Sequence, residues 1–120
     1  MKTKFDVLPD WTFVGGVTQE YEFTLQTEDG GFYDVPGGTA SLAIAPFVNV
    51  NNTVLTKPGV MTTNAEGVAC VAVFTLDPSE TVDLKGKYIY QISVKSAEGS
   101  LASPLRGRMF IANNIDKAFV

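Results

Sequence analysis

The sequence contains no histidine and a single cysteine, Cys70. Histidine is the commonest general base and the commonest transition-metal ligand, so its absence excludes a serine triad, an imidazole-activated thiol and an ordinary zinc site. A lone cysteine also excludes an intramolecular disulfide. Because Cys70 lies in the apolar run 68–74, we expect it to be buried as a small hydrophobic side chain.

Charge is also scarce. Charged residues make up 18% of the chain, and its formal net charge is −4. The nearest approach to a basic cluster is Arg106 with Arg108, which is too little to neutralise the phosphates of a duplex, so we expect no nucleic-acid partner. No apolar run is long enough for a membrane span or a signal peptide. We therefore expect no membrane partner, and synthesis in a cytoplasm without export by the usual route.

Carboxylates are the remaining source of catalytic or metal-binding chemistry. Glu20 and Glu22 lie on one face of a predicted strand, about 7 Å apart by strand geometry, between the separations typical of retaining and inverting glycosidases. That face is solvated, which disfavours a raised pKa. Glu28, Asp29 and Asp34 offer calcium-type oxygen ligands around a hairpin, but their spacing matches no EF-hand. We expect no enzymatic activity, no cofactor and no bound metal.

Apolar and aromatic residues are plentiful. Hydrophobic residues make up 45% of the chain, with eight Phe, four Tyr and one Trp. This is enough to build one hydrophobic core in 120 residues without disulfides or metal. We expect one domain over residues 1–112, followed by a C-terminal tail over residues 113–120.

Alternation of apolar and polar residues dominates the chain and predicts strands with one buried face. The clearest run is 87–95, and the same period recurs in 20–26, 40–44 and 105–111. Residues 68–74 lack a polar face, so we expect that strand to be covered on both sides. Turn signals separate the runs at Asp29-Gly30, Asn51-Asn52, Lys57-Pro58-Gly59, Asn64–Gly67 and Glu98-Gly99. The pattern predicts an all-β, immunoglobulin-like antiparallel β-sandwich.

One segment has helical chemistry instead. Asp77 is placed to cap a helix, Pro78 suits the first helical position, and Glu80 is placed to reach back to the cap. Val82 and Leu84 then return toward the core. We predict one short helical turn near residues 78–84.

Three further features are candidate contact sites. Trp11, with Phe13 two residues on, is either an exposed aromatic platform or a cover for the end of the core, and we favour the cover. Arg106 and Arg108 face outward from the last strand, where they either pair with Glu20 and Glu22 or meet an acidic partner. In the tail, apolar residues including Phe119 fall at helical spacing in a segment too short to be stable alone. The tail therefore either docks on the body or contacts a partner.

In order along the chain, these pieces resemble a known family. The resemblance is carried by Asp29-Gly30, Ser41–Ile44, Thr53–Gly59, Leu76–Glu80, the Gly86–Ile92 strand with its G-K-Y-x-Y-x-I pattern, and the closing strand Leu105–Ile111. It covers roughly residues 11–115 and is similar to the N-terminal immunoglobulin-like domain of phage upper baseplate proteins and related short prophage proteins.

The resemblance implies a non-enzymatic structural protein of a phage tail or baseplate, made in a bacterial cytoplasm and located in the virion. It implies docking to other phage structural proteins, and because such assemblies are symmetric we expect a homo-oligomer. The candidate interface residues are Trp11, Phe13, Arg106, Arg108 and Phe119. The alternative is a carbohydrate- or cell-surface-binding module, in which Trp11, Tyr33 or another exposed aromatic side chain would hold a host-surface glycan.

Overall fold

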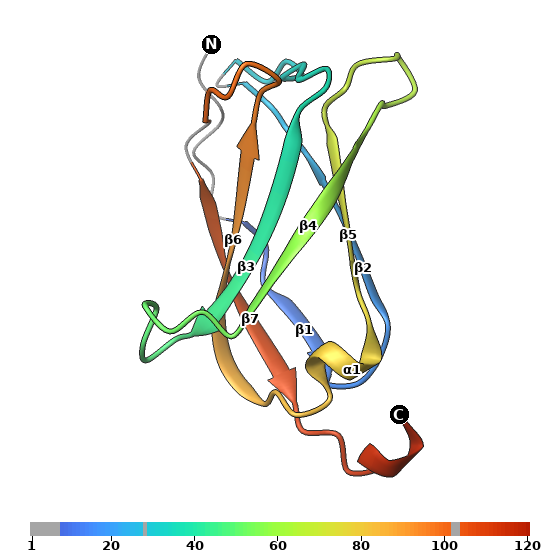
Figure 1. Cartoon of the computed structure of the whole chain (residues 1–120), viewed down its shortest axis with the longest axis vertical. Coiled ribbons are helices and arrows are strands. Elements are labelled where there is room, and N and C mark those ends of the chain that lie inside the picture. The colour runs from blue at the N-terminus through green and yellow to red at the C-terminus, as the bar shows by residue number, and fades with distance from the viewer. Residues whose placement is uncertain (1–7, 28, 102–103) are drawn as a thin grey trace.

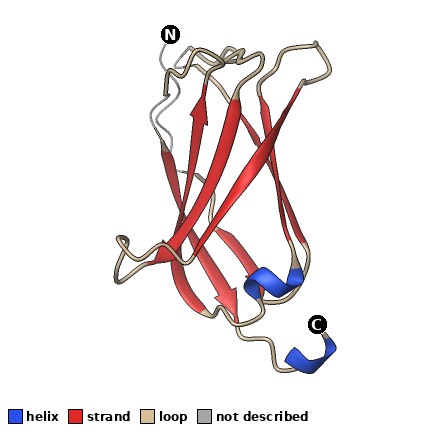
Figure 2. Ribbon diagram, viewed as in Figure 1, coloured by secondary structure: helices blue, strands red, loops and turns tan. Residues whose placement is uncertain are grey.

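The computed structural model describes residues 8–27, 29–101 and 104–120 (Figure 1). The strands in chain order are β1 (Trp11–Val14), β2 (Gln19–Thr24), β3 (Thr39–Pro46), β4 (Leu55–Thr62), β5 (Val71–Leu76), β6 (Gly86–Lys95) and β7 (Leu105–Ala112). The helical elements of the described residues are the one-turn helix α1 (Pro78–Thr81) and the 3₁₀ turn η1 (Lys117–Phe119), drawn in blue in Figure 2.

The strands form two facing layers that share β4. Their order is β1-β7-β6-β3-β4-β5-β2. Residues 55–59 of β4 pair with β3 and residues 60–62 pair with β5, so β4 crosses diagonally from one layer to the other (Figure 1). The two ends of the strand order then face each other, because Trp11 of β1 stacks on Tyr21 of β2 with ring centroids 4.7 Å apart. The fold is the predicted immunoglobulin-like β-sandwich.

One strand pair departs from the antiparallel pattern. Five of the six strand pairs are antiparallel, whereas β1 and β7 run parallel, with Trp11 opposite Met109 and Phe13 opposite Ile111. A parallel pair needs a long connection, and here nearly the whole domain lies between the two strands. The parallel pairing places β1 in the same layer as β6 and β7.

The core lies between the layers and is built by the predicted alternation. Its fully buried side chains come from both layers, including Leu42, Ile44, Cys70, Phe74, Leu76, Tyr90 and Ile111. Cys70 is buried as predicted, and burial raises the pKa of its thiol. Tyr90 is the aromatic centre, in edge contact with the rings of Trp11 and Tyr21. The Tyr90 hydroxyl donates a hydrogen bond to the Pro9 carbonyl, which satisfies its polar end.

Two strand glycines allow aromatic rings to lie directly on the backbone. A Cβ on Gly107 of β7 would come within 2.6 Å of the Tyr90 ring, and a Cβ on Gly59 of β4 would come within 2.5 Å of the Phe74 ring. Both distances are far below ordinary carbon contacts of about 3.5–4.0 Å. The glycines are therefore required by packing and not by a turn.

The structure corrects two sequence predictions. Pro58 and Gly59 lie inside β4 and do not form a turn. Proline is tolerated there because β5 pairs with β4 only from Val60 onward, so the missing N–H interrupts no bond on that side. The run 68–74 is not covered on both faces, because Val71 and Val73 are only half-buried, and the next outward residue of β5, Thr75, is exposed. β5 is central in its layer, yet its outer face meets solvent.

The predicted helical turn is present at α1. The Glu80 carboxylate accepts a hydrogen bond from the Asp77 backbone N–H at 2.8 Å, as the capping pattern requires. The same carboxylate pairs with Lys57 of β4 at 2.8 Å. Thr81, the last residue of α1, is fully buried, and its hydroxyl accepts a hydrogen bond from the Gly16 N–H at 3.0 Å. These contacts fix α1 to β4 and to the β1–β2 turn.

Candidate interaction surfaces

Trp11 and Phe13 belong to the core. Their exposed fractions are 9% and 7%, and their rings are in contact at 5.5 Å between centroids. Trp11 also contacts Tyr21 and Tyr90, so it covers the end of the core. The favoured interpretation of Trp11 is confirmed, and the expectation that Trp11 and Phe13 form an interface is corrected. Neither ring is available to a sugar or to another protein.

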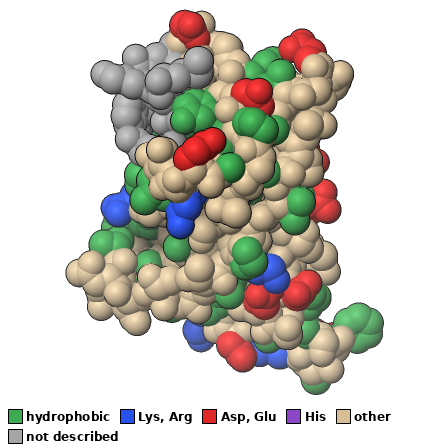
Figure 3. All heavy atoms as spheres, turned by 45° about the horizontal axis from the view of Figure 1, so that its top comes forward, with side chains coloured by type: hydrophobic (Ala, Val, Ile, Leu, Met, Phe, Trp, Pro, Cys, Tyr) green, Lys and Arg blue, Asp and Glu red, His purple; other side chains and the backbone are tan. Residues whose placement is uncertain are grey.

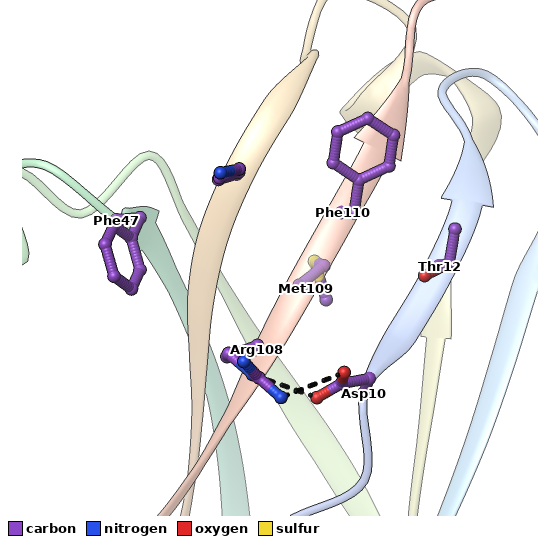
Figure 4. A pocket seen from close by; sticks show the side chains of 7 residues that line it. Asp10, Thr12, Phe47, Arg108, Met109 and Phe110 are labelled. Carbon is purple, nitrogen blue, oxygen red and sulfur yellow. Dashed lines mark hydrogen bonds and ion pairs between the residues drawn. The ribbon is translucent and has the colours of Figure 1, made fainter.

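Arg106 and Arg108 lie on the outer face of β7 and are exposed. Arg108 donates two hydrogen bonds of 3.2 Å to the two carboxylate oxygens of Asp10 (Figure 4). Arg106 donates to the Gln91 side chain at 2.8 Å. Of the two alternatives for these arginines, pairing with Glu20 and Glu22 is wrong, because Asp10 and Gln91 are the partners that they have and no ion pair of the described residues involves either glutamate.

A hollow of about 250 Å³ lies beside Arg108 on this outer face. Phe110 of β7 and Phe47, just beyond β3, stand on either side of β6 (Figure 4), and their exposed fractions are 45% and 53%. Thr12, Phe110 and Lys87 follow one another across β1, β7 and β6 in register. The hollow therefore combines two half-exposed aromatic rings with two cationic side chains.

The backbone holds Phe47 over this face. The Phe47 N–H donates to the Lys87 carbonyl at 3.0 Å, and the Val54 N–H donates to the Ile44 carbonyl at 2.8 Å. These two bonds fix both ends of the segment between β3 and β4 against the sheet. Sequence reasoning missed Phe47, Asp10 and Phe110. The position of Phe110 could have been predicted from the sequence, because the alternation within β7 places it on the same face as Arg106 and Arg108.

The tail is joined to the body by a side-chain hydrogen bond and by the ion pair of Lys117 with Asp83, whose N–O distance is 3.9 Å, and two of its apolar side chains stand in solvent. The Asn114 side-chain amide donates to the Gly15 carbonyl at 2.8 Å. Ile115 and Phe119 are 96% and 89% exposed, and hydrophobic side chains stand out where the tail lies, at the lower right of Figure 3. Phe119 is accessible, as an interface residue has to be.

A second hollow, of about 440 Å³, lies between the segment after β2 and the β6–β7 connection. It is lined by Phe32, Tyr33, Asp34, Val35, Pro36, Ser96, Glu98 and Ser100. Tyr33 is half-buried against the core, and Glu98 is exposed. The Asp34 carboxylate accepts a hydrogen bond from the Ala69 N–H at 3.0 Å. An aromatic face, carboxylates and hydroxyls are thus brought together at one end of the sandwich.

The remaining carboxylates do not converge. Glu20 and Glu22 are exposed on β2. The Asp29 side chain accepts bonds from the Thr27 hydroxyl and the Gly31 N–H, which lower its pKa, and Glu28 lies outside the described residues. Within the described ranges, no three Cys, Asp or Glu side chains gather closely enough to hold a metal ion.

Comparison with known proteins adds a fold likeness alone. No family model and no curated protein matches the sequence. Among solved structures, the fibronectin(III)-like modules of CbhA from Clostridium thermocellum are similar at a TM-score of 0.43 with 7% sequence identity, over 93% of this chain and 95% of that one. No helix in the described part of the chain has the length and apolar character needed to cross a bilayer.

Proposed function

We propose that this domain is a non-enzymatic docking module of a phage tail or baseplate, and that it binds other virion subunits through the outer face of β7 and β6. The phage assignment rests on the resemblance of residues 11–115. The docking assignment rests on one observation, the hollow between Phe47 and Phe110 beside the oriented Arg108. Aromatic side chains, phenylalanine included, and arginine are enriched in protein interfaces relative to the rest of the surface.

The exposed area of the Phe47 and Phe110 rings sets the size of their contribution to the binding free energy. Their exposed fractions of 45% and 53% amount together to about one whole phenylalanine side chain. Burying one such side chain contributes about 1.5–3 kcal/mol, or roughly 10- to 150-fold in affinity. Because Asp10 already orients the Arg108 guanidinium, less side-chain entropy is lost when a partner binds.

The test uses particles from the host that carries the gene. We expect the chain to co-sediment with phage particles, and lysine-directed cross-linking to join Lys87 or Lys95 to another virion subunit. The double variant Phe47→Ser/Phe110→Ser should lose incorporation. The control Val17→Ser/Leu101→Ser, which removes two apolar side chains exposed elsewhere, should keep it. A chain absent from particles, or a Phe47→Ser/Phe110→Ser variant incorporated normally, would contradict the proposal.

The second hollow supports the alternative function of glycan binding. Tyr33 and Phe32 provide aromatic faces for a sugar ring, and Asp34, Glu98 and the two serines provide hydrogen-bonding groups. A glycan array with the parent chain and a Tyr33→Ala variant tests this function. Binding that Tyr33→Ala abolishes would favour it, whereas an array without signal would remove it.

A further inference from the structure

The outer face of the β1-β7-β6-β3 layer is cationic. Its outward positions on β7 and β6 include Arg106, Arg108, Lys87 and Lys95, interleaved with Phe110 and Ile89. Among the described residues, the carboxylate on this face is that of Asp10, and it forms an ion pair with Arg108. Arg106 and Arg108 remain exposed, and each guanidinium has five N–H donors, so both have donors left for a partner.

The outer face of the β4-β5-β2 layer is acidic. Strand register places Glu22 beside Val73 and Val73 beside Val60, in one row across the three strands, and places Glu20 beside Thr75. Val60 is 65% exposed. No Lys or Arg occupies an outward position of these three strands, all of whose residues are described. No ion pair within the described residues involves Glu20 or Glu22.

The two faces match in charge, in spacing and in apolar content. Glu20 and Glu22 are two residues apart on β2, and Arg106 and Arg108 are two residues apart on β7. Both pairs therefore repeat at about 7 Å along an extended strand. Each charged pair lies beside exposed apolar side chains, Val60 on one face and Phe110 on the other. Two carboxylate–guanidinium contacts and an apolar contact can thus form together.

We infer that the cationic face of one copy binds the acidic face of a second copy, so that copies of this chain associate face to back. The inference rests on the proposed function and names the partner of its docking face. The two surfaces lie on opposite sides of the sandwich and differ from each other. The contact is therefore heterologous, and each added copy presents a new free face. Such an association continues into a ring if the rotation closes, or into an open stack if it does not.

Charge-swapped variants of the full chain test this inference. Glu20→Lys/Glu22→Lys makes both faces cationic, and Arg106→Glu/Arg108→Glu makes both anionic. All four side chains lie on strand faces in solvent, so circular dichroism and thermal unfolding check that each variant folds. Sedimentation velocity in about 0.01 M salt, where screening is weak, measures association. Glu66→Lys/Asp116→Lys and Lys85→Glu/Lys117→Glu match the two charge changes at exposed positions outside both faces.

The parent chain and both control variants should associate beyond two copies at low salt and dissociate in about 1 M salt, where the Debye length falls to about 3 Å. Each swapped variant alone should lose association by more than about tenfold, because like charges then meet. An equimolar mixture of the two swapped variants should regain it. A parent chain that stays monomeric, swapped variants that associate unaided, or a mixture that stays monomeric would overturn the inference.

The two proposals fail separately. A chain that is monomeric at low salt but present in particles, and dependent there on Phe47 and Phe110, removes the face-to-back contact and keeps the docking function. A chain that self-associates as described but never enters particles removes the phage role and keeps the contact.

Discussion

Replacing Gly107 by alanine tests how the core is packed. The added Cβ would lie 2.6 Å and 2.7 Å from two atoms of the Tyr90 ring and 2.8 Å from the Leu8 Cβ. Tyr90 is fully buried, and its hydroxyl is held by Pro9, so the ring has little room to withdraw. Overpacking of this kind costs about 1–3 kcal/mol.

A second effect opposes this cost. Glycine to alanine stiffens the unfolded chain and stabilises a protein by about 0.4–1 kcal/mol where the backbone conformation allows it. Gly107 has no positive φ, so this gain applies in full. The net expectation is a loss of about 1–2 kcal/mol. For a chain of this size that corresponds to a decrease in Tm of roughly 4–8 °C.

The assay is urea unfolding followed by tryptophan fluorescence, since Trp11 lies against the Tyr90 ring. A Tyr90→Leu background provides the double-mutant cycle. Leucine does not reach the positions of the outer ring atoms, so Gly107→Ala should cost less there, with an interaction energy of at least about 0.5 kcal/mol. Gly59→Ala, against the Phe74 ring, should behave like Gly107→Ala. A Gly107→Ala protein as stable as the parent would refute the packing account.

Three further predictions concern single groups. Burial raises the pKa of Tyr90 above its ordinary value of 10.0, so the unfolded chain loses this proton at a lower pH than the folded chain. The free energy of unfolding should therefore fall above about pH 10, by up to ~1.4 kcal/mol per pH unit. In alkaline unfolding titrations Tyr90→Phe should flatten this slope, and an unchanged slope would contradict the prediction. The hydrogen bond and ion pair with Lys57, together with the Asp77 N–H, lower the pKa of Glu80 below 4.5. The stabilisation by Glu80 should therefore be present above that pH and be lost as pH falls through the lowered value. Glu80→Gln should cost about 0.5–1 kcal/mol at neutral pH and little in acid, and an equal cost at both pH values would argue against the pair. Thr81→Val should lower the free energy of unfolding by about 1–3 kcal/mol in chemical unfolding, because the Gly16 N–H in the β1–β2 turn would lose its hydrogen-bond acceptor. A variant as stable as the parent would show that this hydrogen bond is dispensable.

Local patterns predicted most of the strands and α1. Period-two alternation in 87–95 and 105–111 indicates which side chains of these strands are buried, and the spacing of Asp77 and Glu80 indicates a capped helical turn. The prediction of a turn at Pro58-Gly59 was wrong because proline and glycine occur both in turns and in strands that cross between layers. Only the three-dimensional arrangement shows that β5 begins to pair at Val60 and that Gly59 makes room for Phe74.

The candidate site was less predictable because its parts come together through topology. Asp10 and Arg108 are 98 residues apart, and their contact depends on the parallel pairing of β1 with β7. Phe47 is placed by a backbone bond to β6. No local pattern encodes which strands become neighbours, so the sequence alone could not decide between the two alternatives for Arg106 and Arg108.

Amide NMR on the unaltered chain, recorded as a dilution series at low salt, tests the face-to-back contact between copies most directly because it locates both surfaces of that contact. The account predicts concentration-dependent shifts in two separate groups, one along β7 and β6 around Arg106–Phe110 and one along β2 and the second half of β4. Both groups should vanish in high salt. Spectra that are identical at every concentration, or shifts confined to Ile115–Val120, would contradict it.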